Sequence, residues 1–466
     1  MRQGTWIVLL LVGCGSEAAS DGPGGVGGDE PSTTGGAGAS VTSGSGSSGG
    51  SVQAGSGGGA QGGSGGGSAQ GGAAGHAGTS SMGGSGGSGP IIVGDAGKGA
   101  PTLKCSTTVN GNRPATAPAL EPGVWKNITP PGIPLGAAET AIGQGIAIDP
   151  CNLSTVYWGN TPFNSGTYGA LWKSTDGGGT WKRAGMIDEP LHVRVDPTNP
   201  KHLYAGDGVR GGTLGFWVSN DGGDTWQKPA GWTAAGKATG FIDDVYDLAV
   251  DPTDFKHILI SSHAAWGWDD TNWKRNAGVM ESKDGGDTWV AHDPQMTWGA
   301  GHSINFLYDP DKGIGDANTW LLGTQGDGQW RTTDAGKTWT KVLTSSIFHG
   351  GGETYYAKDG KLYSTGVSPC LQRSADNGAT WTPLKAVGEC TGVWGDGNFL
   401  YTAPAYSQGM HAMYTSPETD GLTWTAYNGG AQKFDGSGPF EMTFDSVNGI
   451  LYASMWFQGV WALKVK

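Results

Sequence analysis

The strongest constraint on the fold is a short motif that recurs along the C-terminal part of the chain. Residues 174–181 read Ser-Thr-Asp-Gly-Gly-Gly-Thr-Trp, which fits the pattern S/T-x-D-x-G-x-T-W. Four further copies occupy residues 219–226, 282–289, 332–339 and 374–381, and a degraded copy occupies residues 416–424. Five clean copies in one chain do not arise by chance, so the repeat determines the architecture of this region.

Each copy of the motif is typical of a tight turn between two strands. The Asp carboxylate can accept hydrogen bonds from backbone amides, Gly adopts left-handed dihedrals, and Trp packs between sheets. The repeated carboxylates are therefore interpreted as scaffolding and not as catalytic groups. They are Asp176, Asp221, Asp284, Asp334 and Asp376.

A regular strand pattern precedes each copy of the motif. An alternating strand that ends in Asp-Pro or a similar turn comes first, followed by a second strand, a loop and a third strand that runs into the motif. In the first unit this order covers residues 145–150, 155–158, 170–173 and 180–182. The innermost strands of seven such units are expected to begin near Gly145, Leu191, Tyr246, Ile304, Glu353, Gly392 and Phe440.

The last unit, residues 440–466, contains only three strands. Residues 123–128 read like the strand that follows a motif, and no other strands precede them. Pairing this segment with the last unit closes a ring and removes the exposed strand edges. The sequence therefore predicts an all-β, seven-bladed β-propeller over residues 123–466, closed by an N-terminal strand. Seven tryptophans are expected to pack between its blades: Trp125, Trp181, Trp226, Trp289, Trp339, Trp381 and Trp424.

The motif is an Asp-box, and the pattern resembles the bacterial neuraminidase repeat. This repeat occurs in sialidases, in the family 74 xyloglucanases, in sortilin-like receptors and in photosystem assembly factors. The resemblance covers residues 123–466, and the blades look most like those of the xyloglucanases. It implies a propeller that presents its ligand site on one face.

The N-terminus resembles a bacterial lipoprotein signal. Residues 1–13 combine a short charged start with an apolar run at residues 6–12, and the segment 11–14 reads Leu-Val-Gly-Cys. The apolar run is far shorter than the ~20 residues of a membrane span. Cys14 is expected to be the lipidated first residue of an outer-membrane or cell-surface protein, whose membrane contact is the lipid anchor alone. The alternative is an ordinary signal peptide that contains Cys.

Residues 14–100 are rich in Gly, Ser and Ala. They contain too few aromatic and branched side chains to offset the entropy of ordering the chain, so a disordered tether is expected. Residues 101–122 form an entry segment to the propeller. The whole chain carries 41 acidic and 28 basic residues without a Lys/Arg cluster, which argues against nucleic acid as a partner.

Four cysteines follow Cys14, and an exported chain meets an oxidising environment. Cys105 and Cys151 would pin the entry segment to the first blade, and Cys370 and Cys390 lie in neighbouring units. Three connectivities remain open from sequence alone. No Cys/His spacing is typical of zinc, so neither a metal nor a cofactor is expected, and the protein is expected to be a monomer.

The candidate site lies where the innermost strands begin. Four residues before the Asp of the Asp-Pro turn, polar side chains stand where a sheet core would be apolar. They are His192, Asp247, Asn305 and Glu441, with Glu353 near the equivalent place in blade five. A solvated central channel would also tolerate such groups.

Loops on the same face carry further candidates. Blade three contains a long insertion with three indoles, Trp266, Trp268 and Trp273, whose faces would pack on sugar rings. Substrate contacts are also expected from other loops of that face. These residues are Asp207, Arg210, His302, Tyr406 and Trp456.

These observations favour a polysaccharide-recognising glycoside hydrolase. Asp247 and Glu441 would act as base and acid, since the reaction needs two carboxyl groups about 5 to 9.5 Å apart. Glu353 and His192 are further catalytic candidates. One alternative is a non-catalytic module that binds a glycan or a protein. Another is a polysaccharide lyase, in which His192 or His302 would work with Tyr406 to move a proton at a uronate.

Overall fold

The computed structural model describes the chain from residue 103 onward, with gaps. The described ranges are 103–136, 143–161, 168–208, 212–239, 243, 245–262, 278–292, 301–344, 347, 352–366, 370–384, 390–404, 410–435 and 438–465. The chain divides into two units, residues 1–83 and 84–466, and every described residue belongs to the second. The expected lipoprotein signal and Cys14, as well as the tether, lie outside these ranges. Among the described helices, none is long and apolar enough to cross a membrane.

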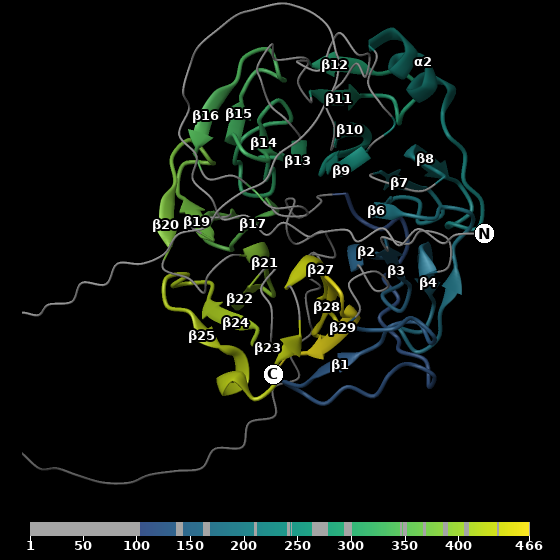
Figure 1. Cartoon of the computed structure of the whole chain (residues 1–466), viewed down its shortest axis with the longest axis vertical. Coiled ribbons are helices and arrows are strands. Elements are labelled where there is room, and N and C mark those ends of the chain that lie inside the picture. Colours follow the sequence, from purple (N-terminus) through teal and green to yellow (C-terminus); the bar gives the residue numbers. More distant parts are fainter. Residues whose placement is uncertain are drawn as a thin grey trace, which may run out of the picture. The chain divides into compact units, whose positions relative to one another are not determined.

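Seven antiparallel sheets surround a central axis and form a seven-bladed β-propeller, as the sequence predicts (Figure 1). Blade 1 contains β2 (Gly143–Ile148), β3 (Val156–Asn160), β4 (Ala170–Ser174) and β5 (Lys182–Arg183). Blade 2 contains β6 (Pro190–Val195), β7 (Leu203–Asp207) and β8 (Gly215–Ser219). Blade 3 contains β9 (Val245–Asp251), β10 (Asp254–Ser262), β11 (Val279–Ser282) and β12 (Val290–His292). Blade 4 contains β13 (Gly301–Phe306), β14 (Trp320–Thr324), β15 (Gly328–Thr332) and β16 (Thr340–Leu343).

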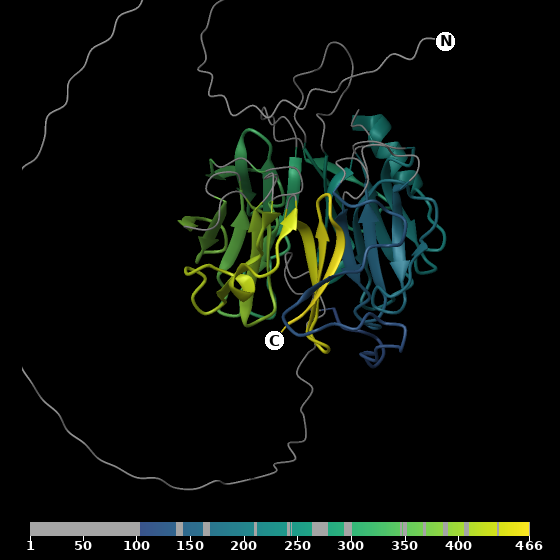
Figure 2. The same ribbon diagram turned by 60° about the horizontal axis from the view of Figure 1, so that its bottom comes forward.

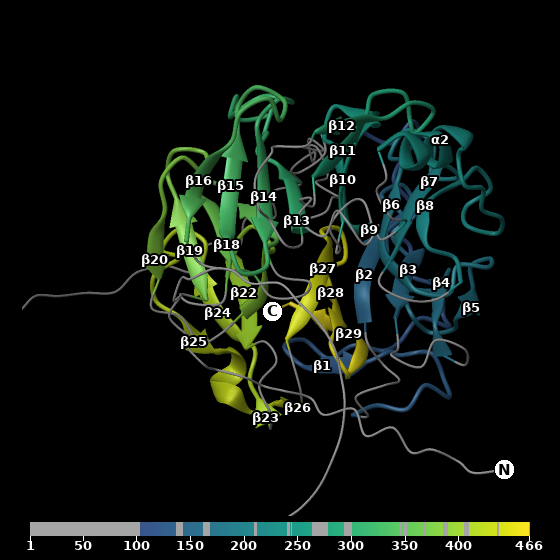
Figure 3. The same ribbon diagram turned by 45° about the horizontal axis from the view of Figure 1, so that its top comes forward.

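The remaining blades follow the same order. Blade 5 contains β17 (Thr354–Tyr356), β18 (Leu362–Thr365), β19 (Leu371–Ser374) and β20 (Thr382–Leu384). Blade 6 contains β21 (Cys390–Gly395), β22 (Phe399–Pro404), β24 (Tyr414–Pro417) and β25 (Thr425–Ala426). Blade 7 contains β27 (Pro439–Asp445), β28 (Ile450–Met455), β29 (Gly459–Lys464) and β1 (Trp125–Asn127). Outside the blades lie α2 (Ala230–Thr239), η1 (Tyr427–Gly430) and the pair β23 (Met410–His411) and β26 (Phe434–Asp435). Figure 3 shows β2, β9, β13 and β27 at the inner ends of their sheets.

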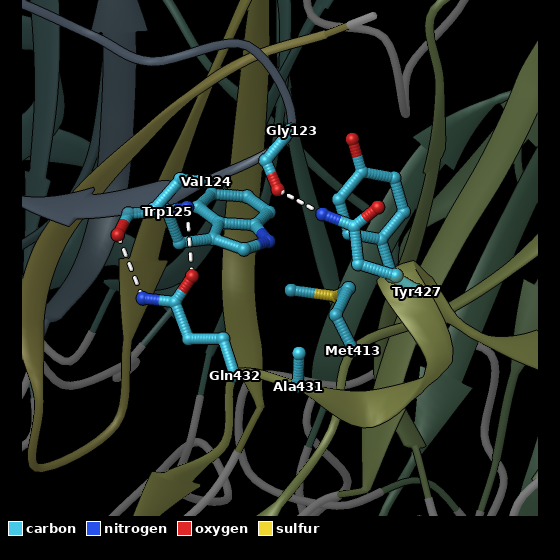
Figure 4. Close-up of a pocket in the computed structure, with 8 residues that line it drawn as sticks. Gly123, Val124, Trp125, Met413, Tyr427, Ala431 and Gln432 are labelled. Carbon is cyan, nitrogen blue, oxygen red and sulfur yellow. Dashed lines mark hydrogen bonds between the residues drawn. The ribbon is translucent and has the colours of Figure 1, made fainter.

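The ring is closed by the predicted N-terminal strand. β1 pairs antiparallel with β29, with Trp125 opposite Leu463 (Figure 1). Gln432 secures the outer edge of β1, because its side-chain amide donates to the Trp125 carbonyl (2.7 Å) and accepts from the Trp125 N–H (2.8 Å). Figure 4 shows this contact beside a small pocket of about 210 Å³, which Trp125, Met413 and Tyr427 help to line. The closing strand is thus hydrogen-bonded on both edges.

Apolar clusters fill the spaces between neighbouring blades. Between blades 7 and 1, for example, Ile146 packs with Tyr452, and Trp181 lies against them. Full burial of one large apolar side chain contributes about 1.5–3 kcal/mol. Each of the other six spaces contains or contacts one more of the seven predicted tryptophans, which confirms their role in packing between blades. These residues are Trp125, Trp226, Trp289, Trp339, Trp381 and Trp424.

The repeated turns are held by their own polar side chains. The Ser174 hydroxyl donates to Asp176 (2.8 Å), and Thr180 donates to the same carboxylate from its backbone N–H (2.8 Å) and its hydroxyl (2.9 Å). The same bonds recur in the four other clean copies. In the second copy, hydrogen bonds from Thr225 lower the pKa of Asp221 to about 2. These carboxylates therefore stabilise the turns, as expected from the sequence.

The entry segment is pinned to the propeller by the expected disulfide between Cys105 and Cys151. It lies at the end of the propeller that also carries the C-terminus (Figure 2), opposite the end where the inner strands begin. Cys370 is also disulfide-bonded. The side chain of Cys390, its predicted partner, is outside the described residues.

An irregularity at the start of the inner strands shapes the candidate site. In six of the seven blades the register shifts near the first residues of the inner strand. A β-bulge changes the direction in which the next side chain points. In blades 2, 3 and 7 the residue directly after the shift is His192, Asp247 and Glu441, respectively. The bulges therefore position the polar residues that the sequence singled out.

Candidate functional site

Five polar side chains meet where the inner strands begin, and we call them the central cluster. They are His192 and Arg194 on β6, Asp247 on β9, Glu441 on β27, and Glu353 just before β17. All five are buried, with exposed fractions between 1% and 7%. The structure thus brings together the four residues that the sequence proposed as catalytic and adds a guanidinium to them.

His192 lies between two of the carboxylates. Its Nε2 is 3.4 Å from Oδ1 of Asp247, and its Nδ1 is 3.6 Å from Oε2 of Glu441. The imidazole therefore occupies the space between the two side chains that the sequence paired as acid and base.

Backbone amides of the neighbouring blade hold both carboxylates. Glu441 accepts a hydrogen bond from the N–H of Ile146 (2.9 Å) and forms an ion pair with the guanidinium of Arg194 (2.9 Å). Asp247 accepts a hydrogen bond from the N–H of Ile304 (2.7 Å). Because the two backbone bonds each cross from one inner strand to the next, these carboxylates also fix the spacing of the blades.

Gly145 occupies the equivalent position in blade 1, where blades 2, 3, 4 and 7 carry polar side chains. A Cβ atom at this position would lie 2.5 Å from the carbonyl oxygen of Leu191. A real Cβ does not approach an oxygen this closely, so glycine is needed for β2 to reach β6. The amide of Ile146, one residue further on, then reaches Glu441.

Asn305 links blades 4 and 5. Its Nδ2 donates to the carbonyl of Gly352 (3.1 Å), and its Oδ1 accepts from the hydroxyl of Thr354 (3.2 Å). Glu353 lies between these two contacts in the chain. In this structure the Asn305 side chain therefore orders the backbone on both sides of Glu353.

A second group of carboxyls lies at the same end of blade 2, and we call Asp188 and Asp207 the aspartate pair. The hydroxyl of Thr213 is 2.5 Å from Oδ1 of Asp188 and also forms a hydrogen bond with Oδ2 of Asp207. Asp188 further accepts from the N–H of Gly212 (2.9 Å). A hydroxyl has one hydrogen to donate, so it donates a hydrogen bond to one of the two carboxyls and accepts a hydrogen bond from the other, which must then be protonated.

Asp207 is the member of the pair that holds the proton. It is fully buried, whereas Asp188 is partly exposed. Burial raises the pKa of Asp207 to about 8, and the negative charges of Asp188 and Glu189 add to the increase despite the opposing hydrogen bond from Thr213. At neutral pH the aspartate pair therefore carries a proton that an ordinary aspartate would have lost.

The remaining predicted contacts fall into two groups. His302 is buried and stacks on Tyr246, with ring centroids 4.6 Å apart. Trp456 is buried and stacks on Phe440 at 4.5 Å. The other predicted substrate contacts lie outside the described residues: Arg210, Trp266, Trp268, Trp273 and Tyr406.

Sequence reasoning missed the aspartate pair. It named Asp207 as a substrate contact, but Asp188 and Thr213 carry no signal of their own, because their association requires a loop to fold back against β7. The acidic step Asp188-Glu189 before Pro190 was the available hint.

It also missed a buried network in blade 3. His257 pairs with Asp251 (3.0 Å) and with Glu281 (2.8 Å), and His292 pairs with the other oxygen of Glu281 (2.9 Å). This network extends across the sheet from β9 to β12. Burial alone would raise the pKa of Glu281, but the hydrogen bonds from His257, His292 and Lys283 outweigh it and lower the pKa.

No known family model matches the sequence. A curated xyloglucanase from Paenibacillus sp. is 27% identical over 222 residues, which cover 41% of this chain and 19% of that protein. This chain thus spans about a fifth of the length of that relative. Among solved structures, YCF48 bound to a D1 peptide has a TM-score of 0.48 at 14% identity and covers 75% of this chain and 99% of its own. An ancestral GH74 enzyme has a TM-score of 0.45 at 16% identity, covering 72% of this chain and 45% of its own. The chain is a seven-bladed β-propeller with weak sequence similarity to a xyloglucanase.

Proposed function

We propose that this protein is a glycanase that binds a polysaccharide at the end of the propeller where the inner strands begin and hydrolyses its glycosidic bonds. The observation that carries the proposal is that a partly exposed carboxyl, Asp188, and a buried one, Asp207, share the hydroxyl of Thr213. Burial raises the pKa of Asp207 to about 8, which favours a carboxylic acid at neutral pH. Hydrolysis of a glycosidic bond needs a carboxylic acid that is still protonated at the working pH and a second carboxylate beside it. The sequence similarity to a xyloglucanase supports a xyloglucan-like polysaccharide as the substrate class.

The two aspartates take different parts in the proposed reaction. Asp188 is partly exposed and can touch the substrate, whereas Asp207 is buried and stores the proton behind the Thr213 hydroxyl. Both carboxyls contact the Thr213 hydroxyl, so Asp207 can pass its proton through Thr213 to Asp188, which gives it to the leaving oxygen as the glycosidic bond breaks. Water attacks the anomeric carbon, and the proton that the water loses restores the aspartate pair.

The sequence favoured a different pair, Asp247 and Glu441, for the same chemistry. Both carboxylates accept backbone hydrogen bonds, and His192 lies between them. These contacts favour a role in ordering the site, while the aspartate pair holds the reacting proton. Amide variants of both pairs, tested side by side, decide between the two assignments.

The experiment uses the full chain and a panel of soluble polysaccharides that includes xyloglucan. Binding is measured on a glycan array, and hydrolysis by the release of reducing ends. Wild type is expected to release them, and Asp188→Asn and Asp207→Asn are expected to lose at least a hundredfold of the rate, since general acid–base catalysis contributes about 10²–10⁴-fold. Asp224→Asn is the matched control, because Asp224 lies in the turn at the other end of the same blade and is exposed.

The other outcomes identify the alternatives. Binding without new reducing ends would contradict hydrolysis and indicate a glycan-binding module. An unsaturated product that absorbs in the ultraviolet would indicate a lyase. Loss of activity in Asp247→Asn or Glu441→Gln, with full activity in the two aspartate-pair variants, would return the chemistry to the central cluster.

We also propose that the protein acts at the cell surface, tethered through a lipid on Cys14 and the Gly/Ser/Ala-rich segment 14–100. The support is the signal-like N-terminal sequence. Metabolic labelling with a fatty acid is expected to mark wild type and not Cys14→Ala. Unlabelled wild type would contradict the anchor.

A further inference from the structure

Three potential metal ligands from three different blades converge in the central cluster. His192 comes from blade 2, Glu353 from the start of blade 5 and Glu441 from blade 7. One ligand atom of each lies within 4.8 Å of the other two, and all three side chains are buried. Ligands lie about 2.0–2.2 Å from a tetrahedral Zn²⁺, so they are about 3.4 Å from one another. Nδ1 of His192 and Oε2 of Glu441 are 3.6 Å apart and already close to this spacing, whereas Glu353 would have to move inward to complete the site.

The orientation of His192 is a second, independent observation that points to a cation. Its Nε2 faces Asp247 at 3.4 Å, while its Nδ1 faces Glu441 at 3.6 Å, beyond hydrogen-bond distance. Among the residues that the structure describes, this buried Nδ1 has no hydrogen-bond partner. A metal-bound histidine commonly has this arrangement, in which a carboxylate orients one ring nitrogen and the other nitrogen donates its lone pair to the ion.

The balance of charge in the cluster supports the same conclusion. Among the described residues, the carboxylates of Asp247, Glu353 and Glu441 are buried near the guanidinium of Arg194. Arg194 pairs with Oε1 of Glu441 (2.9 Å), and Oε2 of the same carboxylate faces His192. Buried carboxylates are costly unless a positive charge lies beside them, and a divalent cation supplies such a charge.

We propose that the central cluster binds one divalent transition-metal cation, Zn²⁺ or Mn²⁺, through Nδ1 of His192 and one carboxylate oxygen each of Glu353 and Glu441. Asp247 orients the imidazole from the outer shell. Imidazole with two carboxylates suits Zn²⁺ or Mn²⁺, whereas Ca²⁺ and Mg²⁺ take oxygen ligands. The ion would join blades 2, 5 and 7 at the axis. A bound ion would also prevent Glu441 from acting as an acid or base, whereas the aspartate pair would remain available for acid–base catalysis.

The test uses the full chain, stripped with EDTA and then titrated with Zn²⁺ and, separately, with Mn²⁺ and Ca²⁺. Calorimetry and elemental analysis are expected to show one Zn²⁺ or Mn²⁺ per chain, a raised Tm, and much weaker binding of Ca²⁺. His192→Ala and Glu353→Gln are expected to weaken binding at least tenfold. His202→Ala is the matched control, because His202 also lies in blade 2 and pairs with Asp196, away from the cluster.

Two results would overturn the metal site: wild type that binds no ion stoichiometrically, or unchanged affinity in folded His192→Ala. If His192→Ala does not fold, the absorption spectrum of Co²⁺-loaded wild type decides, since nitrogen and oxygen ligation is expected and its absence would refute the site. The metal site does not depend on the proposed hydrolysis. Asp207→Asn is expected to keep the ion and lose activity, so the two proposals fail separately.

Discussion

Replacement of Asp207 by asparagine is expected to stabilise the protein at neutral pH. The folded state raises the pKa of this carboxyl from 3.8 to about 8, so folding retains a proton that the unfolded chain releases. The contribution of a neutral Asp207 to the free energy of unfolding is complete below pH 3.8 and is lost progressively as the pH rises toward about 8. Between the unfolded-state pKa and pH 7 lie about three pH units, and each unit lowers the free energy of unfolding by about 1.36 kcal/mol, so wild type has lost about 4 kcal/mol at pH 7. Asparagine cannot ionise and does not suffer this loss.

Asparagine gives up part of the hydrogen bond with Thr213, which costs about 1 kcal/mol. The net expectation for Asp207→Asn is a gain of about 3 kcal/mol at pH 7 and a loss of about 1 kcal/mol at pH 4, so the two stability curves cross. Urea denaturation of both proteins at pH 4, 5.5 and 7 measures the difference. Asp224→Asn serves as the control and should parallel wild type.

A constant difference between Asp207→Asn and wild type over this pH range would refute the reasoning. So would a variant that is less stable than wild type at pH 7. Either result would mean that Asp207 is ionised in the folded protein, and the aspartate pair would then hold no extra proton.

Three further substitutions test the construction of the propeller. Gly145→Ala is expected to cost about 1–3 kcal/mol, because its Cβ has no room against the neighbouring inner strand; an unchanged urea midpoint would contradict this. Gln432→Ala removes two hydrogen bonds from the closing strand, so the backbone amide of Trp125 is expected to exchange its hydrogen faster. An exchange rate equal to that of wild type would show that these two hydrogen bonds do not stabilise the strand. Glu281→Gln breaks a buried pair with His257 and is expected to cost about 3 kcal/mol at neutral pH. The pair lowers the pKa of Glu281 and raises that of His257. The cost of Glu281→Gln should therefore shrink when the pH falls through the folded-state pKa of Glu281, and also when it rises through the folded-state pKa of His257. A difference in Tm between variant and wild type that does not depend on pH would contradict this.

The ring itself could be predicted because the repeat determines the pairing unit. Each motif marks one turn, and the three-stranded last unit leaves one edge that residues 123–128 fill. The convergence of His192, Asp247 and Glu441 was also predictable, since equivalent positions of inner strands face a common axis. The blade count, the closing strand and the convergence of these three side chains therefore follow from periodicity.

The chemistry of the site depends on contacts that periodicity does not determine. Leu191 shifts the register of β6 before His192, and nothing in a hydrophobic pattern marks such a bulge. The raised pKa of Asp207 arises from its burial and from the charge of Asp188, which lies before β6, while Thr213, before β8, contacts both carboxyls. Sequence pattern locates side chains on a face, whereas proton affinity depends on burial and on non-local partners.

The pH dependence of reducing-end release by wild type and Asp207→Asn tests the central claim most directly. With a proton held by the aspartate pair, wild-type kcat/KM is expected to fall as the pH rises through about 8, and Asp207→Asn is expected to release almost no reducing ends at any pH. Release by Asp207→Asn at the wild-type rate would contradict the account.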